Sequence, residues 1–303
     1  KKIPKMIKNK LAIILTAKKY NNILKKALEA IYNQTVMPQQ IIIVMTEKEN
    51  FTVPKKTNTR IIYSKIKNQV YQRKIGLKFL NKNIEFILQL DDKIILEKNS
   101  IKFLLNEWRE CDTYTAGIAI NPKNYIRPKT SLFHHLTLTN SNIDGKILYS
   151  GFANGWSETK KNKEMNWLNG GMTSWKIKLV PQIYNRKFPI LNWSVCEDLF
   201  FSYNVSKKYK LLLSSKSKAK IILKKKKISI KESFYNGFIH AKILHSFVLQ
   251  NKKFSIFFFY YAIFSSGILG ITINLFKLNF VNVFRFIGRF IGSFFIYSKK
   301  EIS

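Results

Sequence analysis

Acidic residues are scarce in this chain, which has 17 Asp and Glu against 53 Lys and Arg in 303 residues. A formal charge of +36 is typical of proteins that bind nucleic acid, an anionic membrane surface or acidic ligands. Lysine is spread through the chain beside many Ile and Asn, so biased codon usage is an equally good explanation. No recognised DNA- or RNA-binding motif is present, and the aromatic residues gather near the C-terminal end. We therefore expect no nucleic-acid partner.

Cysteine is scarce as well. Cys111 and Cys196 are the only two, and neither belongs to a CxxC or a paired Cys/His motif. This excludes a disulfide framework and a zinc module, and favours a reducing compartment. The apolar run at residues 11–17 is too short for a secretory signal and precedes a helix-like segment, so we expect no such signal. Disorder is excluded because 46% of the residues are apolar.

Short apolar runs alternate with segments of helical periodicity in the first part of the chain. Continuous apolar runs predict buried strands, and apolar residues at every third or fourth position predict helices. The predicted strands are 11–16, 41–45, 60–64, 86–90 and 115–120, and the predicted helices are 21–34, 71–80 and 101–108. This alternation predicts an α/β fold with a mostly parallel sheet flanked by helices. Ligands of such sheets bind outside the carboxyl ends of the strands.

Two adjacent acids, Asp91 and Asp92, follow the predicted strand 86–90. Because like charges repel, such a pair usually persists where a cation lies between them, most often a metal that also holds phosphate. The alternative is an exposed turn that precedes a helix near Ser100. The pair therefore points first to a metal–nucleotide site.

Further along, residues 121–167 follow no regular pattern, apart from a hairpin expected at Asp144-Gly145. A long irregular segment inside a compact domain is typical of a functional loop or lid. A second acid pair, Glu197-Asp198, precedes another apolar run. Taken alone, this pair is best explained as the first turn of a helix, where acids meet the positive end of the helix dipole.

Several short motifs occur in a fixed order between residues 9 and 215. They are residues 16–21, 33–35 and 72–77, Leu90-Asp91-Asp92, Asn169-Gly170-Gly171 and Glu197-Asp198. This order resembles the family 2 glycosyltransferases, whose Rossmann-like nucleotide-sugar-binding fold is called GT-A. The resemblance implies an enzyme that moves a sugar from a nucleotide-diphosphate donor to an acceptor.

The resemblance also implies roles around the donor. Asp91 would contact the ribose, and Asp92 would bind a divalent Mn²⁺ or Mg²⁺ that bridges the diphosphate. Arg73 would lie near the nucleotide, where its guanidinium suits phosphate; a surface salt bridge is the alternative. Thr16, at the end of the first strand, is a further donor-binding candidate.

Two positions depart from the family's pattern. Relatives carry an acidic residue after the second strand that reads the base, but here Val44 is followed by Met45, so Thr46 or Glu47 would take over that contact. Lys93 stands where many relatives have a third acid. These departures are the best support for a degenerate glycosyltransferase that binds the donor without turnover.

The second acid pair and the glycine segment would form the reacting side. Asp198 matches the catalytic base of inverting members, which takes the proton of the acceptor hydroxyl, and Glu197 is the second candidate for that role. Asn169, Gly170 and Gly171 match the segment that lines the donor-sugar and acceptor cleft, where glycine lets the backbone approach a ligand. A simple turn is the alternative for this segment.

Residues 254–276 are 23 residues without a charge, long enough to cross a hydrocarbon core of about 30 Å. From 280 to 294, apolar residues recur every three or four positions, while Arg285 and Arg289 share another side, as in an interfacial amphipathic helix. We expect residues 254–298 to associate with a membrane surface or bilayer. A packed soluble hairpin is the alternative, and whether the first segment spans the membrane stays open.

These features together predict a GT-A domain over residues 1–230 and a hydrophobic and amphipathic helical region over 231–303. The predicted function is a metal-dependent, inverting hexosyl- or deoxyhexosyltransferase that serves surface polysaccharide synthesis. Its acceptor would be a glycan or lipid-linked saccharide at the cytoplasmic face of a prokaryotic-type cell membrane, where nearby lysines favour anionic lipid. The alternatives are a basic protein that binds nucleic acid or an acidic polymer, and the degenerate donor-binding protein.

Overall fold

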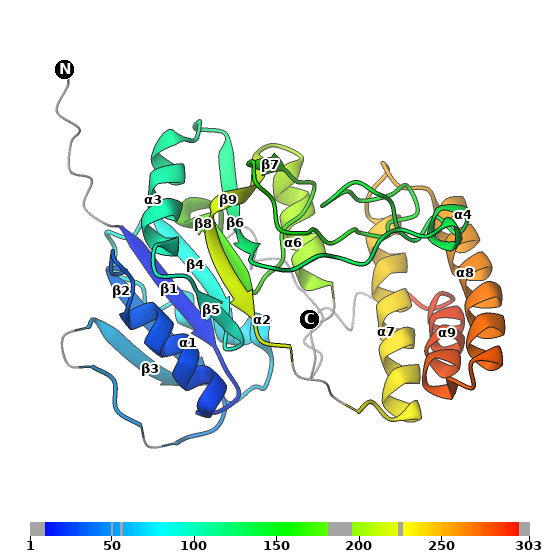
Figure 1. The fold of residues 1–303 in the computed structure, drawn as a ribbon, viewed down its shortest axis with the longest axis horizontal. Helices are drawn as coiled ribbons and strands as arrows, with labels where there is room; N and C mark the ends of the chain where they lie inside the picture. Colours follow the sequence, from blue (N-terminus) through cyan, green and yellow to red (C-terminus); the bar gives the residue numbers. More distant parts are fainter. Residues whose placement is uncertain (1–9, 50, 55–56, 181–195, 224–226, 297–303) are drawn as a thin grey trace.

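A nine-stranded sheet flanked by helices forms the centre of the protein, and a group of long helices stands beside it (Figure 1). The structure, a computed structural model, describes residues 10–49, 51–54, 57–180, 196–223 and 227–296. The strand order is β3-β2-β1-β4-β8-β6-β9-β5, with β7 paired to β9 off this path.

The N-terminal half is a parallel unit. Its elements are β1 (Leu11–Thr16), α1 (Asn22–Tyr32), β2 (Gln40–Met45), β3 (Thr59–Tyr63), α2 (Gln69–Leu77) and β4 (Phe86–Asp91). β1 lies between β2 and β4, and every residue of β1 and β2 is buried, which explains their continuous apolar sequences. α1 begins where the Asn21 side chain accepts the N–H groups of Ile23 and Leu24. The predicted mostly parallel α/β sheet is confirmed.

The second half adds strands of mixed direction. It contains β5 (Ile94–Leu96), α3 (Ser100–Glu110), β6 (Thr115–Pro122), β8 (Met172–Lys176), a 3-10 turn η1 (Ile177–Leu179), α6 (Glu197–Ser206) and β9 (Lys210–Ile221). β8 runs antiparallel between β4 and β6. Because of this direction, the segment just before β8 lies beside the end of β4, where the first acid pair stands. A run of four lysines at 224–227 follows β9, and most of it, at 224–226, lies outside the described residues.

The segment 121–167 is largely irregular, as predicted, with only α4 (Leu132–Leu136) and β7 (Lys163–Glu164). The hairpin is displaced from its predicted position, because the paired residues are Ile147 and Ala153, across a turn at 149–150. At the predicted position, Asp144 instead forms ion pairs with Arg127 and Lys163. Those ion pairs connect the turn at 144–145 to Arg127 of the irregular segment and to Lys163 of β7.

The C-terminal region consists of α7 (Ile230–Leu249), α8 (Ile256–Phe276) and α9 (Phe280–Gly292). The last two match the predicted apolar and amphipathic segments, and residues 297–303 lie outside the described part. α7 and α9 cross with their backbones in contact, since a methyl group added at Gly288 would overlap the carbonyl oxygen of Phe234. Gly292 faces Phe238 and Gly237 faces Arg285 in the same way.

A second apolar cluster joins these helices to the rest of the chain. Leu199 and Tyr203 of α6 pack in it with Phe247 of α7 and Phe259 of α8. The rings of Tyr203 and Phe247 lie 5.4 Å apart, edge to face. α6, which carries the second acid pair, is therefore held directly by the C-terminal helices. The division into domains at residues 230 and 231 stays a prediction.

Candidate active site

α2 lies close against the carboxyl ends of β1 and β2. The side-chain amide of Gln72 donates to the carbonyl of Ala17 at 2.8 Å and to that of Val44 at 2.9 Å. A methyl group added at Gly76 would lie 2.7 Å from the side chain of Ile14, so glycine permits this approach. These contacts place the next residue, Arg73, beneath the edge of the sheet. The sequence did not predict that Gln72 anchors α2. The only feature that could have indicated this role is its position next to Arg73.

Arg73 connects the two acid pairs. Its guanidinium is only 2% exposed and lies 3.0 Å from an Asp91 carboxylate oxygen and 3.5 Å from a Glu197 carboxylate oxygen. A buried cation needs such partners, because desolvation costs several kcal/mol per ion. The arginine is therefore not part of a surface salt bridge. It brings residues that are distant in sequence to one point.

The glycine segment closes over this ion pair. The carbonyl of Gly171 accepts the Asp91 N–H at 2.9 Å. A methyl group added at Gly171 would lie 2.5 Å from the Asp91 carboxylate, and one added at Gly170 would overlap the Arg73 guanidinium. Asn169, the first residue of the segment, accepts the hydroxyl of Thr173 through its carbonyl. The segment packs tightly against the ion pair and forms one wall of the site, so it is more than a simple turn.

Asp198 is held by backbone N–H groups. Gly170 N–H donates to one carboxylate oxygen at 3.3 Å, and Leu199 N–H donates to the other at 2.9 Å. Helix α6 begins at Glu197, so both acids lie in its first turn, as the helix-start interpretation requires. The same placement brings Asp198 beside the glycine segment, and its side chain stays partly exposed. The helix-start interpretation is therefore confirmed, and the role of Asp198 as a catalytic base stays a prediction.

Burial raises the pKa values of Glu197 and Asp198. It raises the pKa of Glu197 to about 7, an effect that the neighbouring Asp198 increases and Arg73 opposes. Burial also raises the pKa of Asp198, opposed by the hydrogen bonds from Gly170 and Leu199. A carboxylate with a raised pKa accepts a proton more readily at neutral pH. The raised pKa values make both acids candidates for a proton acceptor.

The remaining donor-side candidates lie along the strand ends. Asp92 N–H donates to the Thr16 carbonyl at 3.2 Å. The Thr16 hydroxyl is buried and forms no hydrogen bond with any described residue, so a ligand could be its partner. The Thr46 hydroxyl donates to the Lys18 carbonyl, and Glu47 forms an ion pair with Lys18 at 3.1 Å. Thr46 and Glu47 follow the end of β2, and both contact Lys18, which follows β1.

A divalent ion fits this site only with the substrate's help. The described residues contain no group of three His, Cys, Asp or Glu side chains able to hold a metal. Asp91 is engaged by Arg73, while Asp92 is partly exposed at the strand end. Mg²⁺ and Mn²⁺ are commonly held by one or two carboxylates together with substrate phosphates, which agrees with this donor set. Lys93 is exposed, and its carbonyl accepts the N–H of Ile222.

Glu197 should give the protein a pH-dependent stability. Its pKa is raised from 4.5 to about 7 on folding, so the folded state holds the proton between these values while the unfolded state has lost it. Stability should therefore fall as pH rises through this window, by at most about 3 kcal/mol. Thermal unfolding from pH 5 to 8 should show the Tm of the wild type falling relative to that of Glu197→Gln. Parallel curves for the two proteins would exclude the shift.

Comparison with known proteins agrees with this architecture. No family model matches the chain, and no curated protein matches it by sequence. Among solved structures, the mannosyltransferase PcManGT from Pyrobaculum calidifontis, in complex with GDP-Man and Mn²⁺, matches with a TM-score of 0.57 over 94% of this chain and 87% of its own, at 9% identity. S. aureus TarS matches with a TM-score of 0.52 over 88% of this chain, at 15% identity.

The match with TarS covers 43% of that protein's length. Its fragment 1–349 in complex with UDP-GlcNAc matches over 91% of this chain and 89% of the fragment, with a TM-score of 0.51 and 13% identity. At such identities the likeness shows a shared fold. The predicted GT-A fold is therefore confirmed, and its neighbours are glycosyltransferases solved with nucleotide sugars.

Proposed function

We propose that this chain is a metal-dependent, inverting glycosyltransferase of family 2. The observation that carries the proposal is the buried Arg73, which joins Asp91 at the end of β4 to Glu197 at the start of α6. This arrangement places a nucleotide-side carboxylate and a candidate base around one wall, Gly170-Gly171, at the carboxyl edge of a GT-A sheet. PcManGT and TarS, which share the fold, bind GDP-Man and UDP-GlcNAc.

In the proposed reaction, the ribose and diphosphate of the donor lie along Thr16, Asp91 and Asp92. Asp198 accepts the proton of the acceptor hydroxyl as that oxygen attacks the anomeric carbon, and the bond to the diphosphate breaks on the opposite face. Gly170 N–H keeps the Asp198 carboxylate oriented. A divalent ion at Asp92 would neutralise charge on the departing diphosphate.

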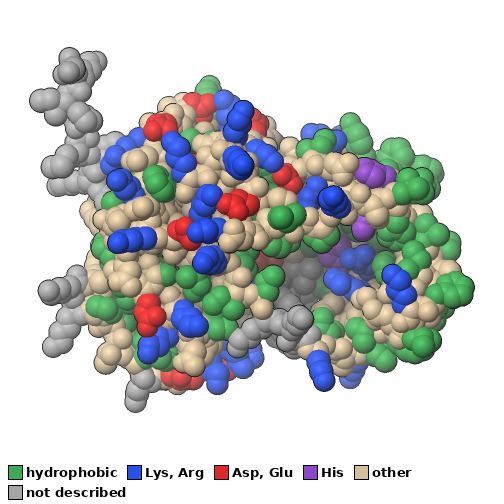
Figure 2. Space-filling view, in the orientation of Figure 1, with side chains coloured by type: hydrophobic (Ala, Val, Ile, Leu, Met, Phe, Trp, Pro, Cys, Tyr) green, Lys and Arg blue, Asp and Glu red, His purple; other side chains and the backbone are tan. Residues whose placement is uncertain are grey.

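The exposed apolar surface of α8 and α9 supports a place at the membrane. α8 is the one described helix long and apolar enough to cross a bilayer, and only 33% of its most apolar window is buried. Phe257 and Phe276 are 70% and 86% exposed, and hydrophobic side chains cover this end of the molecule (Figure 2). Such patches rarely face water. We place these helices at the cytoplasmic face of a cell membrane, where surface polysaccharide is made from glycan or lipid-linked acceptors.

Vesicle flotation tests the membrane proposal. The wild type should float with vesicles that contain anionic lipid. Burial of apolar side chains in the bilayer and attraction of lysines to anionic headgroups both favour binding. Phe257→Glu with Phe276→Glu should stay largely in the soluble fraction. Equal flotation of both proteins would place membrane contact elsewhere.

Donor binding tests the enzymatic proposal. Thermal unfolding is measured with UDP- and GDP-linked sugars, with and without Mn²⁺, since a ligand of the folded state raises Tm. We expect one donor to raise Tm in a metal-dependent manner and to be consumed when acceptor is added. Metal-dependent binding without turnover would instead indicate the degenerate protein. Binding of acidic polymers alone, with an affinity that falls steeply with salt, would indicate the polymer-binding alternative.

A further inference from the structure

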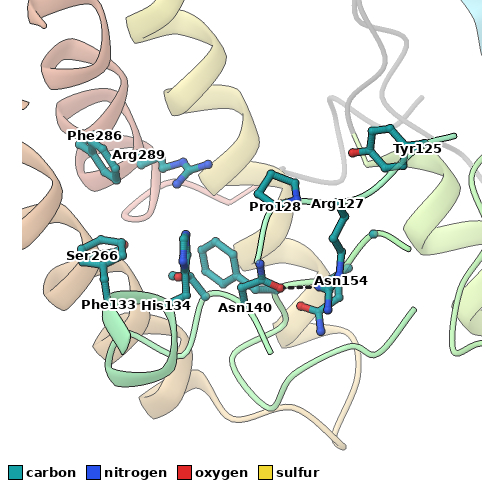
Figure 3. A pocket seen from close by; sticks show the side chains of 14 residues that line it. Tyr125, Arg127, Pro128, Phe133, His134, Asn140, Asn154, Ser266, Phe286 and Arg289 are labelled. Carbon is teal, nitrogen blue, oxygen red and sulfur yellow. Dashed lines mark hydrogen bonds between the residues drawn. The ribbon is translucent and has the colours of Figure 1, made fainter. Parts of the chain in front are cut away.

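A cavity of about 350 Å³ lies between the segment 121–167 and the C-terminal helices. Figure 3 shows its lining, to which the irregular segment contributes Arg127, His134, Asn140 and Asn154, and α9 contributes Phe286 and Arg289. None of the described lining residues is acidic. In Figure 2 a hollow between the two parts of the molecule contains side chains of the Lys/Arg and His classes. The cavity is therefore suited to a negatively charged group.

Arg289 is one of the two arginines that line this cavity. The nitrogen Nε of its guanidinium is buried and forms no hydrogen bond with a described residue, and no described carboxylate lies within ion-pair distance. Its guanidinium lies 5.6 Å from the ring centre of Phe286. Burial, with Arg285 nearby, lowers the pKa of Arg289 to about 10, so the side chain is still cationic at neutral pH.

The groups around Arg289 do not supply a counter-charge. Arg285 is also positive, and burial together with both arginines lowers the pKa of His240 to about 3, so that this histidine is neutral. The His240 Nδ1 is buried without a partner among the described residues. Arg127 differs, since it already pairs with Asp144 and donates to Asn140. Arg289 as a whole is half-buried, and its buried Nε has no described partner. A cation withdrawn from water without a carboxylate is costly unless an anion binds there.

Arg289 connects this cavity to the start of α6, the side of the site to which the proposed function assigns the acceptor. Arg289 is close enough to Cys196 for its charge to oppose the increase in the pKa of that thiol, and Cys196 directly precedes the acid pair. The donor diphosphate, by contrast, is assigned to Thr16, Asp91 and Asp92 at the ends of β1 and β4. An anion beside Arg289 would thus belong to the molecule that delivers the hydroxyl to Asp198.

We propose that this cavity is a phosphate subsite for an anionic acceptor, with Arg289 as the cation that binds it. The inference rests on the proposed function, since it assigns the acceptor side of the same site. The shared chemistry is a phosphate group, carried either by a lipid in the membrane that faces α8 and α9 or by a soluble sugar phosphate. Asn140 adds a neutral amide to the lining, whereas the Asn154 amide already donates to Ser141 and Ile143.

The test measures binding of octyl phosphate and of inorganic pyrophosphate to the full chain by calorimetry. Arg289→Gln should weaken binding about tenfold or more, because a charge-assisted contact is lost. Arg109→Gln, which removes an exposed arginine of α3, should leave binding unchanged. Much tighter binding of octyl phosphate indicates a lipid source, and equal binding indicates a soluble one. Absence of binding to the wild type, or equal binding by Arg289→Gln, would overturn the proposal.

Two further readouts distinguish a phosphate subsite from a purely structural role of Arg289. The Tm of unliganded Arg289→Gln should equal or exceed that of the wild type, because an uncompensated charge has been removed. A clear fall in Tm would show that Arg289 is structural and would count against the subsite. The donor-induced rise in Tm should persist in the variant. If the wild type itself shows no such rise, the proposed function fails, whatever the phosphate probes show.

Discussion

Replacement of Asp198 by Asn should lower kcat by about 10²–10⁴-fold while donor binding persists. Asn keeps the size of the side chain and one oxygen for the Leu199 N–H, but it cannot take the proton of the attacking hydroxyl. In the proposed reaction, Asp198 contacts neither the ribose nor the diphosphate, so the donor-induced rise in Tm should stay close to that of the wild type. Initial rates at saturating donor and acceptor provide the measurement.

Glu197→Gln is the matched control for this result. Glu197 is its neighbour in the same helical turn and is 7% exposed, but its carboxylate faces Arg73. We expect a smaller loss of kcat in Glu197→Gln than in Asp198→Asn. The reverse order would assign the base to Glu197, and full activity in Asp198→Asn would remove that residue from the chemistry.

Arg73→Met should reduce the free energy of unfolding by about 3–5 kcal/mol, because it leaves buried carboxylates without their cation. Asp91 and Glu197 would both lose their partner, and the packing of Gly170 on the guanidinium would be lost as well. Denaturant unfolding of the two proteins measures the difference. Arg109→Met, at an exposed position of α3, should change stability by no more than about 0.5 kcal/mol.

A double variant sharpens this prediction. If Arg73 is needed to compensate buried charge, then Glu197→Gln should cost less, or even stabilise, in the Arg73→Met background. The double-mutant cycle then gives a coupling between the two residues of at least about 1 kcal/mol. Additive losses would mean that Arg73 stabilises the fold by packing alone.

The fold was predictable where burial on both faces dictates the residue type. β1 and β2 are continuous apolar runs because helices and neighbouring strands cover them, and the sequence carries that signal directly. β9 was not predicted, since its lysines and serines alternate only partly with leucines along an unevenly buried strand. α7 was not predicted as one helix because its apolar residues occupy more than one face, toward α6, α8 and α9.

The candidate site was predictable only as a set of ordered motifs. Asp91, Glu197 and Asp198 were singled out, but nothing local states that Arg73 lies between the two acid pairs, because that contact depends on how β4 and α6 meet. Arg289 shows the same limit. Its periodicity assigned it to the polar side of an amphipathic helix, whereas the fold covers that side with the segment 121–167 and leaves a cavity. Periodicity reports the side of a helix but not what faces it.

The crossing of α7 and α9 fixes the distance between these two helices. At Gly237 and Gly288 the two backbones touch, so no layer of side chains between them can compress or slide. α9 is therefore fixed against α7, and the second apolar cluster joins α7 and α8 to α6. An acceptor anchored beside Arg289 would meet Asp198 only if its hydroxyl stands at the matching distance from the anchor. The protein would then select acceptors by the distance between the anchored group and the hydroxyl, without recognising each sugar unit between them.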